Sequence, residues 1–330
     1  MESKEKKRAI VAGGNGFLGL NLISELSSSG WHTTVFDMSL SHLEKLNPDR
    51  TTLILGDITD PESCERAMPE GVDAVFHLAG NTSHWKLGDD RQTKVNINGT
   101  RNMVKAALKR KAKRFVYTSS IAAYGFQPGL ITEETTSNAD NYWINYFRTK
   151  RQAEIEVHRG IESGLDAVML NPSNIVGPYD HYGWSRMFRL VNEDKLPGAP
   201  PGKASFCHVK EVAKAHISAH ERGTTGHNYL LGGSDATWLE FMNEIAVLLG
   251  KKTHKKPIPA FVLKTIGQLS LYVSYITKKE PDVTPEKAKL VCSDLICSTE
   301  KAVKELDYKV VHLNDMLKDC HQWMISERML

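Results

Sequence analysis

Short runs of apolar and β-branched residues alternate with helical patterns through the first half of the chain. Six runs predict strands, at residues 9–12, 33–36, 52–55, 74–78, 114–118 and 167–170. Between the first two runs, apolar residues from Phe17 to Leu26 recur at helical spacing, and Gly30 stands where the helix should end. Strands that alternate with helices predict an α/β fold with a doubly wound parallel sheet.

The pattern changes after residue 170, where proline, glycine and aromatic residues become frequent and mixed helical segments follow to the end. We therefore expect residues 1–170 to form the core of a nucleotide-binding domain. Residues 171–330 should form mainly a smaller substrate-binding lobe, although segments after residue 205 could return to the sheet. Helix-start signals at Asp60-Pro61 and at 41–44 support the alternation.

Composition removes several classes of protein. The 330 residues are 41% hydrophobic and 25% charged, with a net charge of +3, which is too small to indicate nucleic acid as the main ligand. Five cysteines without CxxC spacing indicate free thiols and no metal site. No apolar stretch is long enough to span a membrane, and the charged N-terminus leaves no room for a signal peptide. We expect a cytoplasmic protein.

A glycine-rich segment follows the first predicted strand and opens the first helix. Missing β-carbons allow a tight turn and let backbone N–H groups approach a pyrophosphate, as in Rossmann-type domains. The segment fits both GxGxxG and GxxGxxG, and it predicts a cofactor loop made of Gly13, Gly14, Asn15, Gly16, Phe17, Leu18 and Gly19.

Asp37 lies 18 residues beyond Gly19, at the end of the second predicted strand. There its carboxylate can accept hydrogen bonds from the adenosine ribose, and its charge would repel a 2′-phosphate. This position favours NAD over NADP without excluding NADP. The alternative is an aspartate that caps the following segment beside Ser39 and Ser41.

Tyr146 and Lys150 are one helical turn apart, so both side chains project from the same face. We expect the ammonium to lower the pKa of the phenol and suit it to acid–base chemistry. Tyr275 and Lys279 repeat the spacing. Only Tyr146 follows a hydroxyl, Ser120, placed just after a predicted strand, where ligands bind in an open parallel sheet.

With these motifs the chain resembles the extended short-chain dehydrogenase/reductase family over nearly its whole length. The resemblance also rests on GDITD at 56–60, HLAG at 77–80, VNINGT at 95–100, NPSNIVGP at 171–178 and FCHVKEVA at 206–213. The last third is most similar to the dihydroflavonol reductase and 3β-hydroxysteroid dehydrogenase branch.

The resemblance implies an NAD(P)-dependent oxidoreductase with a Ser-Tyr-Lys mechanism. Tyr146 would exchange a proton with the substrate oxygen, Ser120 would orient that oxygen, and Lys150 would hold the nicotinamide ribose. Ser120 is preferred over Ser119 because the family's hydroxyl stands four residues before a Tyr-Gly pair, here at 124–125. Further cofactor contacts implied are Asp57, Ile58, Leu78, Ala79, Gly80, Asn96, Thr118, Pro172, Ser173, Asn174 and Ile175.

Several chemistries compete within this family. The chain has Ile121-Ala122 where related dehydratases carry an Asp-Glu pair, which disfavours dehydration. A nucleotide-sugar epimerase is the runner-up, because Arg186 and Arg189 could bind a diphosphate. A non-catalytic NAD-sensing regulator is the third interpretation, although it should have lost one of the three catalytic side chains. We favour interconversion of a secondary alcohol and a ketone on a hydrophobic small molecule.

Aromatic segments after the fourth strand and after residue 178 should shape the substrate pocket, with Asn81, His84, Trp85, Tyr179 and Trp184 as candidates. His77 and His208 are expected to be structural. Residues 261–276 form a strongly apolar helix that we expect to pack in the core of the lobe, with weak membrane contact as the alternative. The resemblance also implies a homodimer through the helices around 91–111 and 141–160.

Overall fold

The computed structural model describes residues 6–42, 46–196 and 198–330. Its centre is a seven-stranded parallel sheet in the order β10-β7-β5-β4-β1-β2-β3. All six predicted strands lie in this sheet, so the predicted doubly wound α/β fold is confirmed. Its strands are β1 (Arg8–Ala12), β2 (His32–Asp37), β3 (Thr51–Leu55), β4 (Ala74–His77), β5 (Phe115–Thr118), β7 (Ala167–Pro172) and β10 (Asn228–Leu231).

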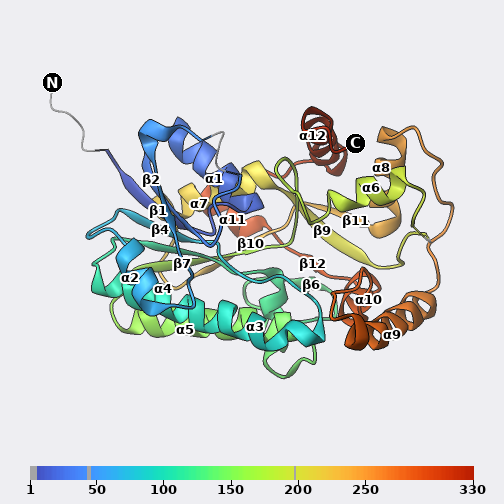
Figure 1. The fold of residues 1–330 in the computed structure, drawn as a ribbon, viewed down its shortest axis with the longest axis horizontal. Helices are drawn as coiled ribbons and strands as arrows, with labels where there is room; N and C mark the ends of the chain where they lie inside the picture. The colour runs from blue at the N-terminus through green and yellow to red at the C-terminus, as the bar shows by residue number, and fades with distance from the viewer. Residues whose placement is uncertain (1–5, 43–45, 197) are drawn as a thin grey trace.

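Helices cover both faces of this sheet (Figure 1). One apolar cluster joins the sheet to α1 (Phe17–Ser28), α7 (Val209–Arg222) and α11 (Glu300–Leu306). A second cluster on the opposite face joins it to α2 (Pro61–Ala67), α4 (Thr100–Lys109) and α5 (Asn145–Glu162). Both faces of the inner strands are buried in this way, which explains why those strands are apolar runs. The edge strand β3 is not buried: Leu53 and Leu55 are 45% and 66% exposed.

Local signals set several element ends. Asp60 caps α2 by accepting a hydrogen bond from the Glu62 N–H, as the Asp60-Pro61 pair predicts. Gly30, after α1, has a φ of +83°, the left-handed conformation that favours glycine. The predicted start signal at 41–44 extends into residues 43–45, which lie outside the described residues. Before α4, α3 (Asp89–Thr93) continues through a π-helical stretch at Lys94–Gly99.

The C-terminal half contributes to both parts of the molecule. β10 and α7 return to the large sheet, and Tyr229 of β10 is completely buried there. Other segments of this half build a lobe around β8 (Asn174–Val176), β9 (Lys203–His208) and β11 (Ser234–Thr237), which form a three-stranded sheet. Its helices are α6 (Arg186–Asn192), α8 (Trp238–Leu248) and α12 (Leu313–Ser326).

A small peripheral subdomain lies at the lower right of Figure 1. It contains α9 (Ala260–Thr277) and α10 (Pro285–Val291), beside the two-stranded ladder of β6 (Leu130–Ile131) and β12 (Ile296–Cys297). The expectation that residues 261–276 pack in the lobe core is wrong. Leu263 and Leu271 are buried, but Phe261 and Ile276 are 68% and 85% exposed, because only one side of α9 has a neighbour.

Acid should destabilise this fold through His216, which joins α7 to β5. Its ring bonds the Thr118 hydroxyl at 2.7 Å and the Val212 carbonyl at 2.7 Å, and burial lowers its pKa from about 6.5 to about 4. Between about pH 6.5 and pH 4, His216 therefore binds a proton in the unfolded chain and stays neutral in the folded chain. This histidine should cost roughly 2 kcal/mol of unfolding free energy between pH 7 and pH 5.

Urea unfolding of the chain and of its His216→Gln variant at these two pH values measures this effect. We expect the variant to lose less stability on acidification than the parent, by about 1–2 kcal/mol. The exposed His254→Gln substitution is the matched control. An equal pH dependence in all three proteins would contradict the assignment.

Candidate active site

The carboxyl ends of β1, β4, β5 and β7 meet at one edge of the parallel sheet, and a cleft of about 720 Å³ opens there. The structure brings most of the predicted site residues to this cleft. Its lining includes Gly13, Asn15, Gly16, Phe17, Leu18, Gly19, Leu78, Gly80, Thr118, Ser120, Tyr146, Lys150, Pro172, Ser173, Ile175 and Tyr179. Residues from both halves of the sequence therefore form one cleft.

A smaller cavity of about 310 Å³ adjoins this cleft and shares Gly13 and Gly16 with it. Its lining adds Asp37, Ile58 and Ala79, three of the predicted cofactor contacts. Together the two cavities extend from the end of β2 to the side chain of Tyr146. This elongated shape suits a dinucleotide, with the adenosine end near Asp37 and the reactive end near Tyr146.

Three positions of the glycine turn have no room for a side chain. Gly13 has a φ of +86°, and a β-carbon there would lie 2.6 Å from the Ala79 nitrogen. A β-carbon on Gly19 would lie 2.3 Å from the Gly13 carbonyl oxygen. Gly14 packs inward, where a β-carbon would meet the Val35 side chain at 2.7 Å. The backbone of the turn is thus free to approach a phosphate closely.

Asp37 supports this turn as well as facing the smaller cavity. One carboxylate oxygen accepts a hydrogen bond from the Asn15 N–H at 3.0 Å, and the other accepts from the Met38 N–H at 2.7 Å. The Ser39 N–H also donates to Asp37, at 3.4 Å. Sequence reasoning assigned Asp37 to the cofactor, with capping beside Ser39 and Ser41 as the alternative, and missed its contact with the loop. The contact fixes the distance between the glycine turn and the end of β2.

Three side chains gather at the other end of the cleft. Lys150, only 5% exposed, donates a hydrogen bond from Nζ to the Thr118 carbonyl oxygen at 2.9 Å. Tyr146 lies one turn earlier on α5, and its phenol interacts with the Ser120 hydroxyl. Ser120 is held at the end of β5, where its Oγ accepts a hydrogen bond from the Ala122 N–H. The predicted catalytic residues are therefore neighbours.

The electrostatics of this cluster correct one expectation. We expected Lys150 to lower the pKa of Tyr146, but burial raises that pKa, and the Ser120 hydroxyl opposes the shift only in part. Burial also lowers the pKa of Lys150 to about 8, although Glu154 opposes this shift. The cause is geometric, because the Lys150 ammonium is directed at the Thr118 carbonyl. With its pKa raised by burial, the Tyr146 phenol keeps its proton at neutral pH.

Glu154, one turn after Lys150, is the residue that sequence reasoning missed. Its Oε1 accepts hydrogen bonds from the Ser119 hydroxyl at 2.6 Å, from Asn171 at 2.6 Å and from Asn228 at 3.0 Å. Burial raises the pKa of this carboxyl. Because Ser119 is held by Glu154, Ser120 is the hydroxyl available to a ligand. Its place one helical turn after Lys150, on the same face of α5, was the signal in the sequence.

Other predicted cofactor residues support the walls of the site. Asn96 bonds the Asn81 backbone through both its side-chain atoms, at 2.7 and 3.0 Å. Asp57 accepts from the Thr59 N–H, and Asn174 donates to the Ser205 carbonyl oxygen. These contacts shape the turns around the two cavities.

The five predicted pocket residues lie in different parts of the structure. Tyr179 lines the cleft, and the His84 ring contacts Tyr146 with 4.9 Å between centroids. Asn81 shapes the turn after β4, whereas the Trp85 indole donates to the Ser274 hydroxyl of α9 at 3.0 Å. Trp184 is not brought to the cleft: it packs against Trp238 in the lobe core, at 4.6 Å between ring centroids.

The two histidines expected to be structural have partners inside the fold. His77 is completely buried, bonds the Thr100 hydroxyl at 3.0 Å, and has its pKa lowered to about 3 by burial. His208 caps α7 by accepting from the Lys210 N–H. Among the described residues, no group of histidine, cysteine or acidic side chains could hold a metal ion.

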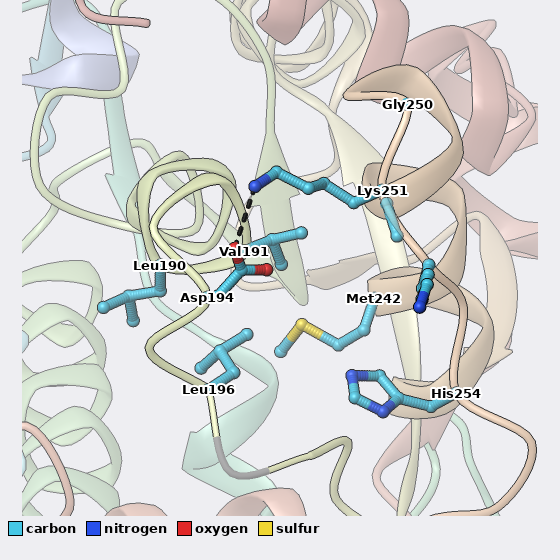
Figure 2. Close-up of a pocket in the computed structure, with 10 residues that line it drawn as sticks. Leu190, Val191, Asp194, Leu196, Met242, Gly250, Lys251 and His254 are labelled. Atoms are coloured by element: carbon cyan, nitrogen blue, oxygen red, sulfur yellow. Dashed lines mark hydrogen bonds and ion pairs between the residues drawn. The ribbon is translucent and has the colours of Figure 1, made fainter.

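A separate cavity of about 480 Å³ lies between α6 and α8 (Figure 2). Leu190, Val191 and Met242 form its apolar wall, and an ion pair of 3.0 Å between Lys251 and Asp194 crosses its upper side. None of the predicted site residues lines this cavity. The cleft beside the glycine turn is thus the candidate active site.

Comparison with known proteins agrees with this geometry. The family model described as "NAD dependent epimerase/dehydratase family" matches residues 9–232. The chain belongs to that family, and the resemblance to extended short-chain dehydrogenases/reductases is confirmed. It is an NAD(P)-dependent oxidoreductase of this type, and NAD is its cofactor. The glycine turn and the two adjoining cavities fit this dinucleotide.

Individual relatives cover nearly the whole chain. A decarboxylating sterol-4-alpha-carboxylate 3-dehydrogenase of Candida albicans is 28% identical, over 93% of this chain and 94% of its own. A 3-beta-hydroxysteroid dehydrogenase of Mycolicibacterium neoaurum is also 28% identical, over 92% and 87%. A solved UDP-glucuronic acid 4-epimerase mutant of Bacillus cereus, with NAD bound, is 19% identical over 97% and 99% with a TM-score of 0.79, which shows the shared fold.

Gly19→Ala should disturb the cofactor turn, because the new β-carbon would meet backbone atoms that cannot move aside independently. We expect a loss of about 1–3 kcal/mol in unfolding free energy and weaker NAD binding. Gly88→Ala is the control, since a β-carbon there meets nothing closer than 3.8 Å. Calorimetric titration with NAD and urea unfolding measure both effects. Unchanged NAD affinity in Gly19→Ala would show that the turn does not hold the cofactor.

Proposed function

We propose that this enzyme interconverts a secondary alcohol and a ketone on a hydrophobic small molecule, with NAD as the hydride carrier. The observation that carries the proposal is the cleft itself. Tyr146, Ser120 and Lys150 line the same cavity as the glycine turn, so acid–base groups and dinucleotide site share one space.

Each residue of the cluster has a role that follows from its contacts. NAD supplies or removes the hydride when it is bound. Tyr146 holds a proton at neutral pH, which suits it to protonate a carbonyl oxygen during reduction and become a phenolate. Oxidation is the reverse step, in which the phenolate takes the proton from the alcohol. Ser120 orients the same oxygen through its hydroxyl. Lys150 lines the same cleft, fixed by its bond to the Thr118 carbonyl, and there it would hold the nicotinamide ribose.

The surroundings of Tyr146 support an apolar substrate. His84 packs on the phenol, and burial lowers the His84 pKa to about 4, so the ring is uncharged at neutral pH. Tyr179 adds a second aromatic wall to the cleft. Two of the relatives are named for a sterol carboxylate and a hydroxysteroid as their substrates, which supports a substrate with a large hydrocarbon skeleton.

The two arginines that could favour a nucleotide sugar have other partners. Arg186 forms an ion pair with Asp282, and Arg189 donates to the His181 carbonyl oxygen at 3.3 Å. A diphosphate would have to compete with both contacts, which favours the dehydrogenase over the epimerase. The three catalytic side chains in the cleft likewise favour an enzyme over a regulator. The homodimer and the cytoplasmic location stay predictions.

Tyr146→Phe removes the proton donor and keeps the ring. We expect turnover to fall at least about 100-fold while NAD affinity stays within about twofold. Tyr275→Phe alters the second YxxxK match and is the control that should keep full activity. NADH absorbance with a panel of apolar ketones and alcohols measures turnover. Normal turnover in Tyr146→Phe would remove this mechanism.

The Asp37 carboxylate should make the enzyme prefer NAD. We expect NAD to bind at least about tenfold more tightly than NADP, since a 2′-phosphate would meet a negative charge. Asp37→Asn removes the charge and keeps an oxygen for the Asn15 N–H. In this variant the ratio of NAD affinity to NADP affinity should therefore be smaller. Fluorescence titration with both dinucleotides provides the test. Equal affinities in the unchanged protein would refute the role of Asp37.

A further inference from the structure

The helix α9 has an apolar stripe that no other part of the described chain covers. Its members share one side of the helix: Leu269, Tyr272 and Ile276 follow one another at three- and four-residue spacing, and Phe261 lies eight residues before Leu269. They are Phe261 at 68% exposure, Leu269 at 61%, Tyr272 at 61% and Ile276 at 85%, with Val273 beside them at 58%. A group of exposed apolar side chains of this kind marks a contact with another molecule or with a membrane.

The opposite side of α9 is firmly packed. Leu263, Gly267, Leu271 and Ser274 are buried, and a β-carbon on Gly267 would lie 2.9 Å from the Thr284 carbonyl. The Ser274 hydroxyl accepts the hydrogen bond from the Trp85 indole. The exposed stripe is thus the outer surface of a fixed helix, at the corner of the molecule seen in Figure 1.

The charge around the stripe has one sign. α9 contains no acidic residue, and Lys264, Lys278 and Lys279 lie on it or at its end. Lys255 and Lys256 come shortly before it in the chain. The nearest acidic residues in sequence are already paired.

Glu280 forms an ion pair with Lys287 at 2.8 Å, and Asp282 pairs with Arg186. None of the five lysines has an ion-pair partner among the described residues. The surface therefore combines exposed apolar side chains with unneutralised positive charge.

We propose that the exposed face of α9 docks on the surface of a bilayer that contains anionic lipids. Its apolar stripe would enter the boundary between headgroups and acyl chains, and the lysines would contact the headgroups. A second copy of the chain fits less well. A two-fold contact of α9 with itself would bring lysines together without an acidic residue to offset them. No helix among the described residues is long and apolar enough to cross a membrane, so the contact lies in the interface.

Docking would place the active site near the bilayer. α9 holds Trp85 through Ser274, and Thr284, just before α10, donates to the His84 carbonyl oxygen. The adjacent His84 ring contacts Tyr146. If the proposed function is correct, an apolar substrate dissolved in the membrane would reach the cleft over a short path. The docking itself does not depend on that function.

Sedimentation with lipid vesicles tests the proposal without using activity. We expect the full chain to bind vesicles of phosphatidylcholine mixed with phosphatidylserine, and to bind pure phosphatidylcholine much more weakly. High salt should weaken the binding, because the lysines act through exposed charge. Leu269→Ser combined with Ile276→Ser should reduce the binding constant at least about tenfold.

Val247→Ser, on the equally exposed Val247 of α8, is the matched control and should bind as the parent does. Lys278→Glu combined with Lys279→Glu should weaken binding to the mixed vesicles and leave the weak binding to pure phosphatidylcholine unchanged. Absence of binding to mixed vesicles, or binding that ignores phosphatidylserine and salt, would overturn the proposal. A dimer in analytical ultracentrifugation that the Leu269→Ser, Ile276→Ser double variant dissociates, without vesicle binding, would assign the face to a second copy instead.

Discussion

The turn between β1 and α1 passes so close to the backbone that follows β4 that only glycine fits at position 13. Gly13 lies against the backbone of Ala79, and Gly19 lies against Gly13 itself. This close contact keeps side chains out of the space above the carboxyl ends of the strands. Because the sheet is parallel, the ends of β4, β5 and β7 open into the same space. The position of the cleft follows from this constraint.

A buried carboxylate then fixes the helix that carries the catalytic residues. Glu154 of α5 reaches β5 through Ser119, β7 through Asn171 and β10 through Asn228. A buried charge is tolerated only where it is hydrogen-bonded, and here three donors meet one oxygen. The register of α5 against the sheet, and with it the positions of Tyr146 and Lys150, depends on this contact. Asn228 also makes the returning strand β10 part of the site's support.

The sequence was sufficient for the sheet, the glycine turn and the Tyr-Lys pair, since each leaves a local pattern. Parallel strands are apolar runs, and a turn without β-carbons needs its glycines at fixed spacing. Long-range contacts leave no such pattern. The hydrogen bonds of Glu154 join residues up to 74 positions apart in the sequence. Trp184 could not be assigned to the core without knowing that Trp238 lies beside it.

The sequence also did not show which side of α9 is buried, because the composition of this helix resembles that of a core helix. Only the neighbours of Leu263 and Leu271 decide which side is buried. The pKa of Tyr146 was misjudged for the same reason: helical spacing places Lys150 near the phenol, but the Thr118 carbonyl determines where the ammonium points.

A crystal structure with NAD bound would give the distance from the Tyr146 hydroxyl oxygen to C4 of the nicotinamide ring. We expect the ring to lie beside this phenol and Ser120, with only enough space between them for a substrate carbon and its oxygen. A nicotinamide ring bound elsewhere, with Tyr146 turned out of the dinucleotide groove, would contradict this expectation.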